Sequence, residues 1–155
     1  MDMVPHPKSE INARIDRLQR QMEEMTGAIL FQLVDMCYFS GTAQEGLVYI
    51  PKDSDPIVMI RKSLERAEQE SPLDVIALGS LKTIKADLGI TSGAVIGLEL
   101  DVLPYNNYSR VQRVLDDAKI VYDWVAGRNC LHIQKSQSNT FYVHEGTLPR
   151  CKYCG

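Results

Sequence analysis

The chain has 155 residues, of which 45% are hydrophobic and 24% are charged, a composition typical of one globular domain. Its net charge is −3 and it has no basic stripe, so we expect neither nucleic acid nor anionic membranes as partners. No run approaches the roughly 20 apolar residues of a membrane-spanning helix, and the polar N-terminus lacks the apolar core of a secretory signal. We therefore expect a cytoplasmic protein.

The first predicted elements are a helix followed by strands. Residues 9–25 carry apolar side chains at three- and four-residue spacing, which predicts one buried helix face, with Ser9 as the N-cap. Residues 28–34 (AILFQLV) have the apolar character of a buried strand. Residues 46–51 and 56–60 predict two more strands, and the turn sequence KDSD between them indicates an antiparallel hairpin.

Helices and strands then alternate along the chain. The predicted helices cover residues 61–71, 80–89 and 107–117, and the predicted strands cover residues 73–79, 93–100 and 118–124. Apolar strands that are separated by helices indicate a largely parallel sheet covered on both faces, to which the hairpin adds an antiparallel strand. The expected fold is a three-layer α/β/α sandwich with a mixed, mostly parallel sheet of five or six strands.

The pattern changes after Trp124. Residues 125–136 are compatible with one more helix, whereas residues 137–155 show no useful period and predict an irregular tail. This part holds a group of possible zinc ligands: Cys130, His132, His144, Cys151 and Cys154. A Cys-x-x-Cys pair supplies two zinc ligands well, but these spacings match no common zinc finger. Two exposed thiols at an irregular chain end explain the pair more simply.

Most carboxylates lie on predicted helix faces and are interpreted as solvated: Glu23, Glu24, Glu65, Glu68, Glu70, Asp116 and Asp117. Glu99 and Asp101 differ, because they lie two residues apart, and hence on one face, at the carboxyl end of a predicted strand. That edge is where α/β sheets place ligand sites. The pair therefore indicates either a small-ligand site or a strand end that caps the helix after it.

Five strings follow one another in a recognisable order: ARIDRLQRQMEEMTGAILF, CYFSGTAQEGLVYIP, VMIRKSLERAEQES, IGLELDVLPYNNYSRVQ and LHIQKS. Together they resemble the N-terminal domain of the creatinase, prolidase and Xaa-Pro aminopeptidase family, the pita-bread metallopeptidases. The resemblance implies a ribonuclease H-like motif. It also divides the chain into a leader (1–11), a creatinase/prolidase N-terminal-like domain (12–130) and a truncated linker with an irregular tail (131–155).

The resemblance implies that catalysis belongs to a separate C-terminal domain, where acidic residues and a histidine hold two divalent metal ions that activate a water molecule. After LHIQKS the sequence departs from the family pattern, and none of those ligands can be placed in the tail. We therefore expect this chain by itself to be inactive as a hydrolase and to hold no cofactor.

The resemblance also implies a role for the N-terminal domain in forming a dimer, with a second copy or with a full-length paralogue, and in narrowing access to the partner's catalytic cleft. The residues that match the family's substrate-facing stretch are Tyr38, Phe39, Gly41, Thr42, Ala43 and Gln44. The competing interpretation of Tyr38 and Phe39 is a buried turn, and Gly41 suits a special backbone conformation. The alternative function is a free-standing module that binds a small ligand or a protein without hydrolysing it.

Overall fold

The computed structural model describes residues 7–100, 102–122, 132–135 and 141–144, with residue 122 and the last two segments described by their backbone alone. The helices are α1 (Lys8–Gln21), α2 (Leu33–Ser40), α3 (Leu64–Glu70), the 3-10 turn η1 (Leu81–Thr83), α4 (Ile84–Asp87) and α5 (Tyr105–Val114). The strands are β1 (Gly27–Leu30), β2 (Gly46–Pro51), β3 (Ile57–Ile60), β4 (Asp74–Ala77), β5 (Val95–Leu98), β6 (Lys119–Tyr122), β7 (His132–Lys135) and β8 (Phe141–His144).

Six strands form the central sheet in the order β4-β3-β2-β1-β5-β6. Strand β2 runs antiparallel to both of its neighbours, and the other three pairings are parallel. The predicted mixed sheet and its β2–β3 hairpin are therefore confirmed. Because β2 alone is reversed, its first residue lies at the same sheet edge as the carboxyl ends of the five other strands.

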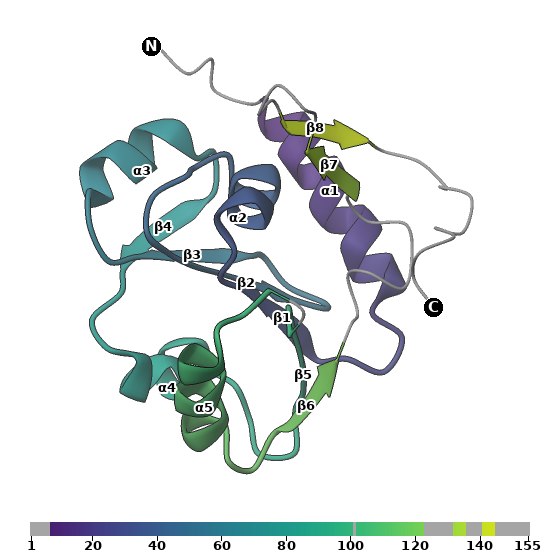
Figure 1. Ribbon diagram of the computed structural model, residues 1–155, viewed down its shortest axis with the longest axis vertical. Helices are drawn as coiled ribbons and strands as arrows, with labels where there is room; N and C mark the ends of the chain where they lie inside the picture. The colour runs from purple at the N-terminus through teal and green to yellow at the C-terminus, as the bar shows by residue number, and fades with distance from the viewer. Residues whose placement is uncertain (1–6, 101, 123–131, 136–140, 145–155) are drawn as a thin grey trace.

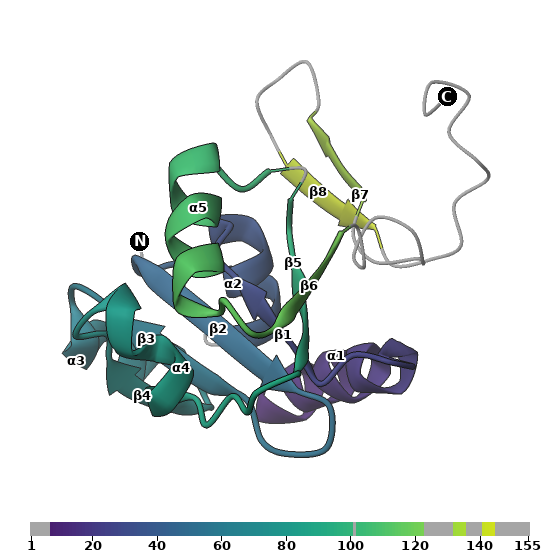
Figure 2. The ribbon, with the colours of Figure 1, turned by 90° about the horizontal axis from the view of Figure 1, so that it is seen from below.

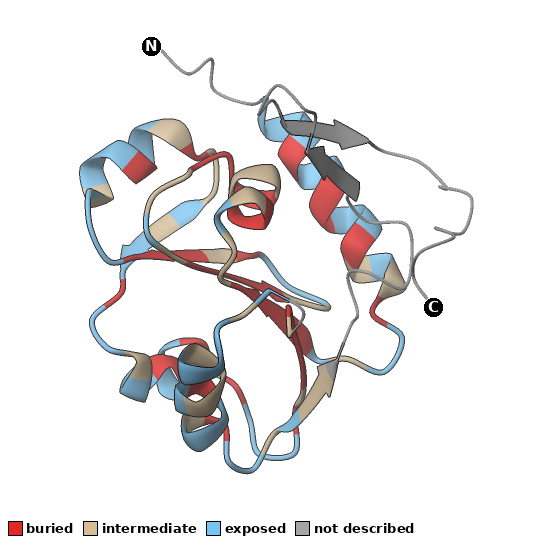
Figure 3. Ribbon diagram, viewed as in Figure 1, coloured by how far each residue is buried: buried red, intermediate tan, exposed pale blue. Residues whose placement is uncertain are grey.

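Helices cover both faces of the sheet (Figure 1). On one face, α1, α2 and α3 pack against a cluster that includes Ile11, Ile15, Leu18 and Met22 from the apolar face of α1. On the other face, α4 and α5 pack against a second cluster around Ile96. Figure 3 shows the buried residues along the sheet and on the inner sides of the helices. The predicted three-layer α/β/α sandwich is confirmed.

The start of α1 differs from its prediction. The N-cap is Pro7, whose carbonyl accepts hydrogen bonds from the backbone N–H groups of Glu10 and Ile11. Ser9 lies inside the helix, so the prediction that its hydroxyl caps the helix is wrong. The fixed φ of proline suits the residue at which a helix starts, and the cap therefore lies two residues earlier than predicted.

Helix α2 replaces the second half of the strand predicted over residues 28–34. The strand ends at Leu30, and the side chain of Gln32 then accepts hydrogen bonds from the N–H groups of Val34 and Asp35, at 2.8 and 3.0 Å. The helix ends at Gly41, which adopts the left-handed conformation with φ +79°. A short apolar run fits a strand or a buried helix equally well, and here the capping residues decide.

Two later predictions also change. The helix predicted over residues 80–89 divides into η1 and α4, although Ser80 caps it as expected by accepting from the N–H of Lys82. Residues 132–135 and 141–144 pair as an antiparallel two-stranded sheet, in place of the expected helix and irregular tail. Across the described ranges, the helices are all too short and too polar to cross a membrane.

Candidate functional site

The central sheet has a topological switch point between β1 and β5, two adjacent parallel strands. From β1 the chain passes to α2 on one face and then to β2, whereas from β5 it passes to α5 on the other face and then to β6. Figure 1 shows α2 and α5 on opposite faces of the sheet, and Figure 2 shows the same elements seen from below. In open α/β sheets, a crevice that holds ligands forms outside the carboxyl ends of such a strand pair.

Glu99 follows β5 at this switch point, and only 3% of its surface is exposed. Its Oε2 accepts hydrogen bonds from the backbone N–H groups of Phe31 and Gln32, at 2.9 and 3.0 Å. These bonds connect the end of β5 to the junction between β1 and α2. The second carboxyl oxygen, Oε1, is buried and accepts no hydrogen bond from any described residue.

Asp35, in the first turn of α2, is the acidic neighbour of Glu99 and is also buried. The pKa of Glu99 is raised to about 9, first by burial and then by the side chain and charge of Asp35. The two backbone N–H groups have the opposite, lowering effect on this pKa. A pKa raised this far keeps the carboxyl group of Glu99 protonated at neutral pH. Asp101, the predicted partner of Glu99, lies outside the described residues.

A cleft of about 410 Å³ opens between α2, the loop that precedes β2, η1 and α5. Its apolar lining comes from both faces of the sheet: Phe31, Leu33, Met36, Leu78 and Leu81. Its polar lining consists of Gln44, Glu45, Arg61, Asn107 and Arg110, and Ala43 and Gly46 complete the wall. Leu33 is 53% exposed, so part of its apolar side chain is available to a ligand.

Positive charge exceeds negative charge at the cleft. Glu45 Oε1 lies 3.6 Å from Nη1 of Arg61, and its other oxygen lies 3.9 Å from Nζ of Lys62. All three side chains are about half exposed or more, so these contacts are weak. Arg110 forms no hydrogen bond or ion pair within the part of the chain that the structure describes.

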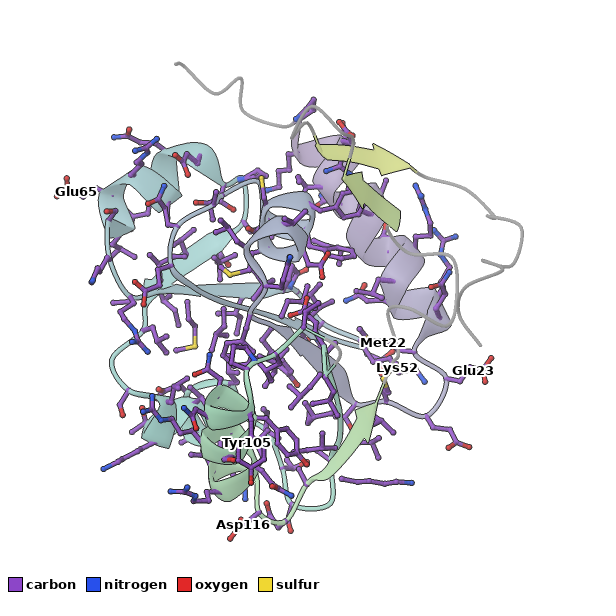
Figure 4. All side chains as sticks on the ribbon, viewed as in Figure 1. Met22, Glu23, Lys52, Glu65, Tyr105 and Asp116 are labelled. Carbon is purple, nitrogen blue, oxygen red and sulfur yellow. The ribbon has the colours of Figure 1, made fainter. Side chains whose placement is uncertain are left out.

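The loop between α2 and β2 is anchored to α3 by Glu70. The carboxylate of Glu70 accepts hydrogen bonds from Thr42 Oγ1 at 2.7 Å, Gln44 Nε2 at 3.1 Å and Arg66 Nε at 2.7 Å. Burial opposes ionisation, but these three bonds and the charge of Arg66 lower the pKa of Glu70 overall. The prediction that Glu70 is a solvated helix carboxylate is therefore wrong, whereas Glu23, Glu65 and Asp116 do point into solvent (Figure 4).

The six residues that were matched to a substrate-facing stretch fall into two groups. Ala43 and Gln44 line the cleft, whereas Phe39 and Thr42 are buried and Gly41 ends α2. Tyr38 is half-buried beneath α1, with the guanidinium of Arg14 4.2 Å from the centre of its ring. Of the six, Ala43 and Gln44 border the cleft, and the role of these residues in substrate access stays a prediction.

Arg61, Asn107 and Arg110 were not predicted from the sequence as site residues. A signal was available for each of them. Arg61 directly follows a predicted strand, and Asn107 and Arg110 are three residues apart and hence on one face of a predicted helix. What the sequence did not provide was the proximity of α5 to the end of β3.

The described residues contain no group of three or more His, Cys, Asp or Glu arranged to hold a metal ion. Cys130, Cys151 and Cys154 lie outside these residues, and His132 and His144 are described by their backbone alone. The family resemblance implies a two-metal centre in a separate C-terminal domain, and that implication stays a prediction.

Residues 14–122 match the family model of the creatinase/prolidase N-terminal domain. The chain belongs to this family. The match covers most of the chain and includes the switch point, the cleft and the loop that Glu70 anchors. No curated protein sequence matches the chain.

Solved structures of creatinase/prolidase N-terminal domains have the same fold. That of an X-Pro dipeptidase from Streptococcus pyogenes is 20% identical, with a TM-score of 0.62 over 72% of this chain and 93% of that one. That of the cytoplasmic peptidase PepQ from Mycobacterium tuberculosis is 18% identical, with a TM-score of 0.62 over 72% and 92%. The Xaa-Pro dipeptidase from Bacillus anthracis is 21% identical, with a TM-score of 0.65 over 83% of this chain but 37% of that one.

Proposed function

We propose that this domain is the non-catalytic part of an Xaa-Pro dipeptidase-like metallohydrolase and that it acts in the cytoplasm. In this role it forms a dimer, with a second copy or with a full-length paralogue, and narrows access to the partner's catalytic site. The family match supports the proposal, as do the names of the similar structures, which include X-Pro dipeptidases and a cytoplasmic peptidase.

The observation that carries this proposal is the anchored loop between α2 and β2. Thr42 and Gln44 are both bonded to Glu70, and the hydroxyl of Ser71 donates to the carbonyl of Ser40 at 2.5 Å. A loop that limits access to another subunit's site needs a fixed shape, and buried polar bonds of this kind provide one. Ala43 and Gln44 stay partly exposed on this loop and are the residues positioned to meet a substrate.

The first experiment measures association. Sedimentation equilibrium of the purified chain should give a dimer, or a heterodimer when a full-length family member from the same organism is added. A chain that stays monomeric under both conditions contradicts the proposal. By itself the chain should not hydrolyse Xaa-Pro dipeptides in the presence of divalent metal ions, and turnover that survives active-site controls would also contradict it.

The second experiment measures access within that heterodimer. Gln44→Trp places a bulky ring at the mouth of the loop and should raise KM for longer peptides more than for dipeptides. Glu65→Trp is the matched control, because Glu65 is exposed on α3 and points into solvent (Figure 4). Equal kinetic constants for both variants would remove the loop from the substrate path.

A second role, the binding of a small ligand by the domain itself, is favoured by the cleft at the carboxyl-end edge of the sheet. This role requires neither a partner nor a catalytic domain.

A further inference from the structure

We propose that the cleft between α2 and α5 binds a small carboxylic acid with an apolar body and an amide group. This inference deepens the proposed ligand-binding role and does not depend on dimerisation or on access to a partner's site. It rests on three features of the cleft, which are its position, its charge and the division of its lining into apolar and polar parts.

The position of the cleft is set by the topology of the sheet. Phe31, Arg61 and Leu78 each lie directly after the carboxyl end of a strand, and Gly46 begins the reversed strand β2 at the same edge. The switch point between β1 and β5, where the helices diverge to opposite faces, lies on the same edge, and the cleft extends from the end of β1 toward β2, β3 and β4 without a lining residue from β5. The volume of about 410 Å³ lies in the range of sites for small molecules and not of protein interfaces.

The charge of the cleft favours an anion. Two arginines, Arg61 and Arg110, line the cleft with one carboxylate, Glu45, on a chain whose overall net charge is −3. Arg110 has no partner within the part of the chain that the structure describes, so its guanidinium is available. The planar fork of donors on arginine matches a carboxylate in two-point contact.

The other lining residues favour an apolar body and an amide group in the ligand. Leu33, Met36 and Leu81 supply apolar surface, and the exposure of Leu33 provides area that a ligand can bury. Asn107 carries both a donor and an acceptor in one side chain, which is the pattern that pairs with an amide, and Gln44, whose Nε2 donates to Glu70, adds its side-chain oxygen as an acceptor. An inorganic anion has neither an apolar surface nor an amide to pair with this part of the lining. A plain hydrocarbon has no charge to pair with the arginines.

N-acetyl-leucine is the probe, because it combines a carboxylate, an amide and a branched apolar side chain. Titration of the full chain, followed by isothermal calorimetry and by backbone amide shifts, should give saturable binding, with the shifts at Phe31, Gly46 and Leu78. N-acetyl-leucinamide, which lacks the charge, should bind about tenfold more weakly, since it forfeits a charge-assisted bond. Inorganic phosphate should also bind at least about tenfold more weakly, since it gains nothing from the apolar lining.

Two arginines of α5 provide a matched pair of variants. Arg110→Gln should weaken binding of N-acetyl-leucine about tenfold, whereas Arg113→Gln, an exposed neighbour outside the cleft, should leave it unchanged. Glu45→Gln should tighten binding, because it removes the carboxylate that competes for Arg61. Both Arg110→Gln and Arg113→Gln are surface changes, so their circular dichroism spectra should match that of the original chain.

Absence of saturable binding, equal affinity for the acid and its amide, or equal affinity of the two arginine variants would each overturn this inference. Phosphate that binds as tightly as N-acetyl-leucine would overturn it as well, because the apolar lining would then be irrelevant. None of these results affects the test of dimerisation, which is measured without ligand. Conversely, a monomeric chain that binds N-acetyl-leucine would refute the access role and support this one.

Discussion

Glu99→Gln tests the buried acid pair at the switch point. A glutamine keeps one side-chain oxygen to accept from Phe31 and Gln32, and its amide can donate toward Asp35 as a protonated carboxyl group does. The variant therefore imitates the protonated form without being able to ionise. We expect the folded structure to be retained and the pH dependence of stability to change.

The magnitude follows from linkage between proton binding and folding. A carboxyl group in the unfolded chain titrates near pH 4.3, whereas the pKa of Glu99 in the folded protein is raised to about 9. Between these values the folded state holds one proton more than the unfolded state, so the free energy of unfolding falls as pH rises, by about 1.4 kcal/mol per pH unit. From pH 6 to pH 8 the original chain should lose up to about 3 kcal/mol through this pair, and Glu99→Gln should not.

The assay is urea unfolding at pH 6, 7 and 8, with Glu65→Gln as the exposed control. The other titrating groups are shared by all three proteins, so their contributions cancel in the comparison. If the free energy of unfolding depends on pH in the same way for the original chain and for Glu99→Gln, the reasoning is refuted. Such a result would mean that Glu99 binds no more protons in the folded state than in the unfolded state. Asp35→Asn should retain part of the slope, since burial is the largest cause of the raised pKa of Glu99.

Two further predictions concern the loop and the strand that border the cleft. Glu70→Gln should reduce the free energy of unfolding by about 1–2 kcal/mol at pH 7 through loss of charge-assisted bonds. Because the pKa of folded Glu70 is lowered, this difference should disappear as pH falls below about 4. Unfolding free energies measured across this pH range, with the exposed Glu68→Gln as the control, would show it. Gly46→Ala should destabilise the folded protein by about 3 kcal/mol or more, because an added Cβ would lie 1.9 Å from the carbonyl oxygen of Met59. Gly79→Ala is the control: a Cβ at this position would meet no atom within 4 Å, so the variant should unfold thermally almost as the original chain does.

The sequence predicted the order of layers well, because local patterns encode it. The spacing of Ile11, Ile15 and Leu18 marks the buried face of α1 whatever the rest of the chain does. The turn sequence between β2 and β3 similarly fixes their hairpin. Helix α2 was missed because Leu30, Phe31 and Leu33 belong to one apolar run. Gln32, which caps the helix within this run, is not a common capping residue.

The candidate site was predicted only in part. Glu99 was identified from its place at a strand end, but its acidic neighbour Asp35 is 64 positions away along the sequence and on a helix that was not predicted. Glu70 was assigned to solvent because a glutamate at the end of a charged helix usually is solvated, and its bond to Thr42 depends on how α3 packs against the loop.

By itself, the sequence determined the fold class, the family and the buried faces, because each of these is written in residues that are neighbours along the chain. The tertiary structure alone decided which polar groups meet. It placed Glu99 against Asp35, Glu70 against Gln44, and Arg110 in one cleft with Arg61. Such contacts depend on strand order and on the face to which each helix crosses, and a one-dimensional pattern does not specify the distance between two residues on different elements.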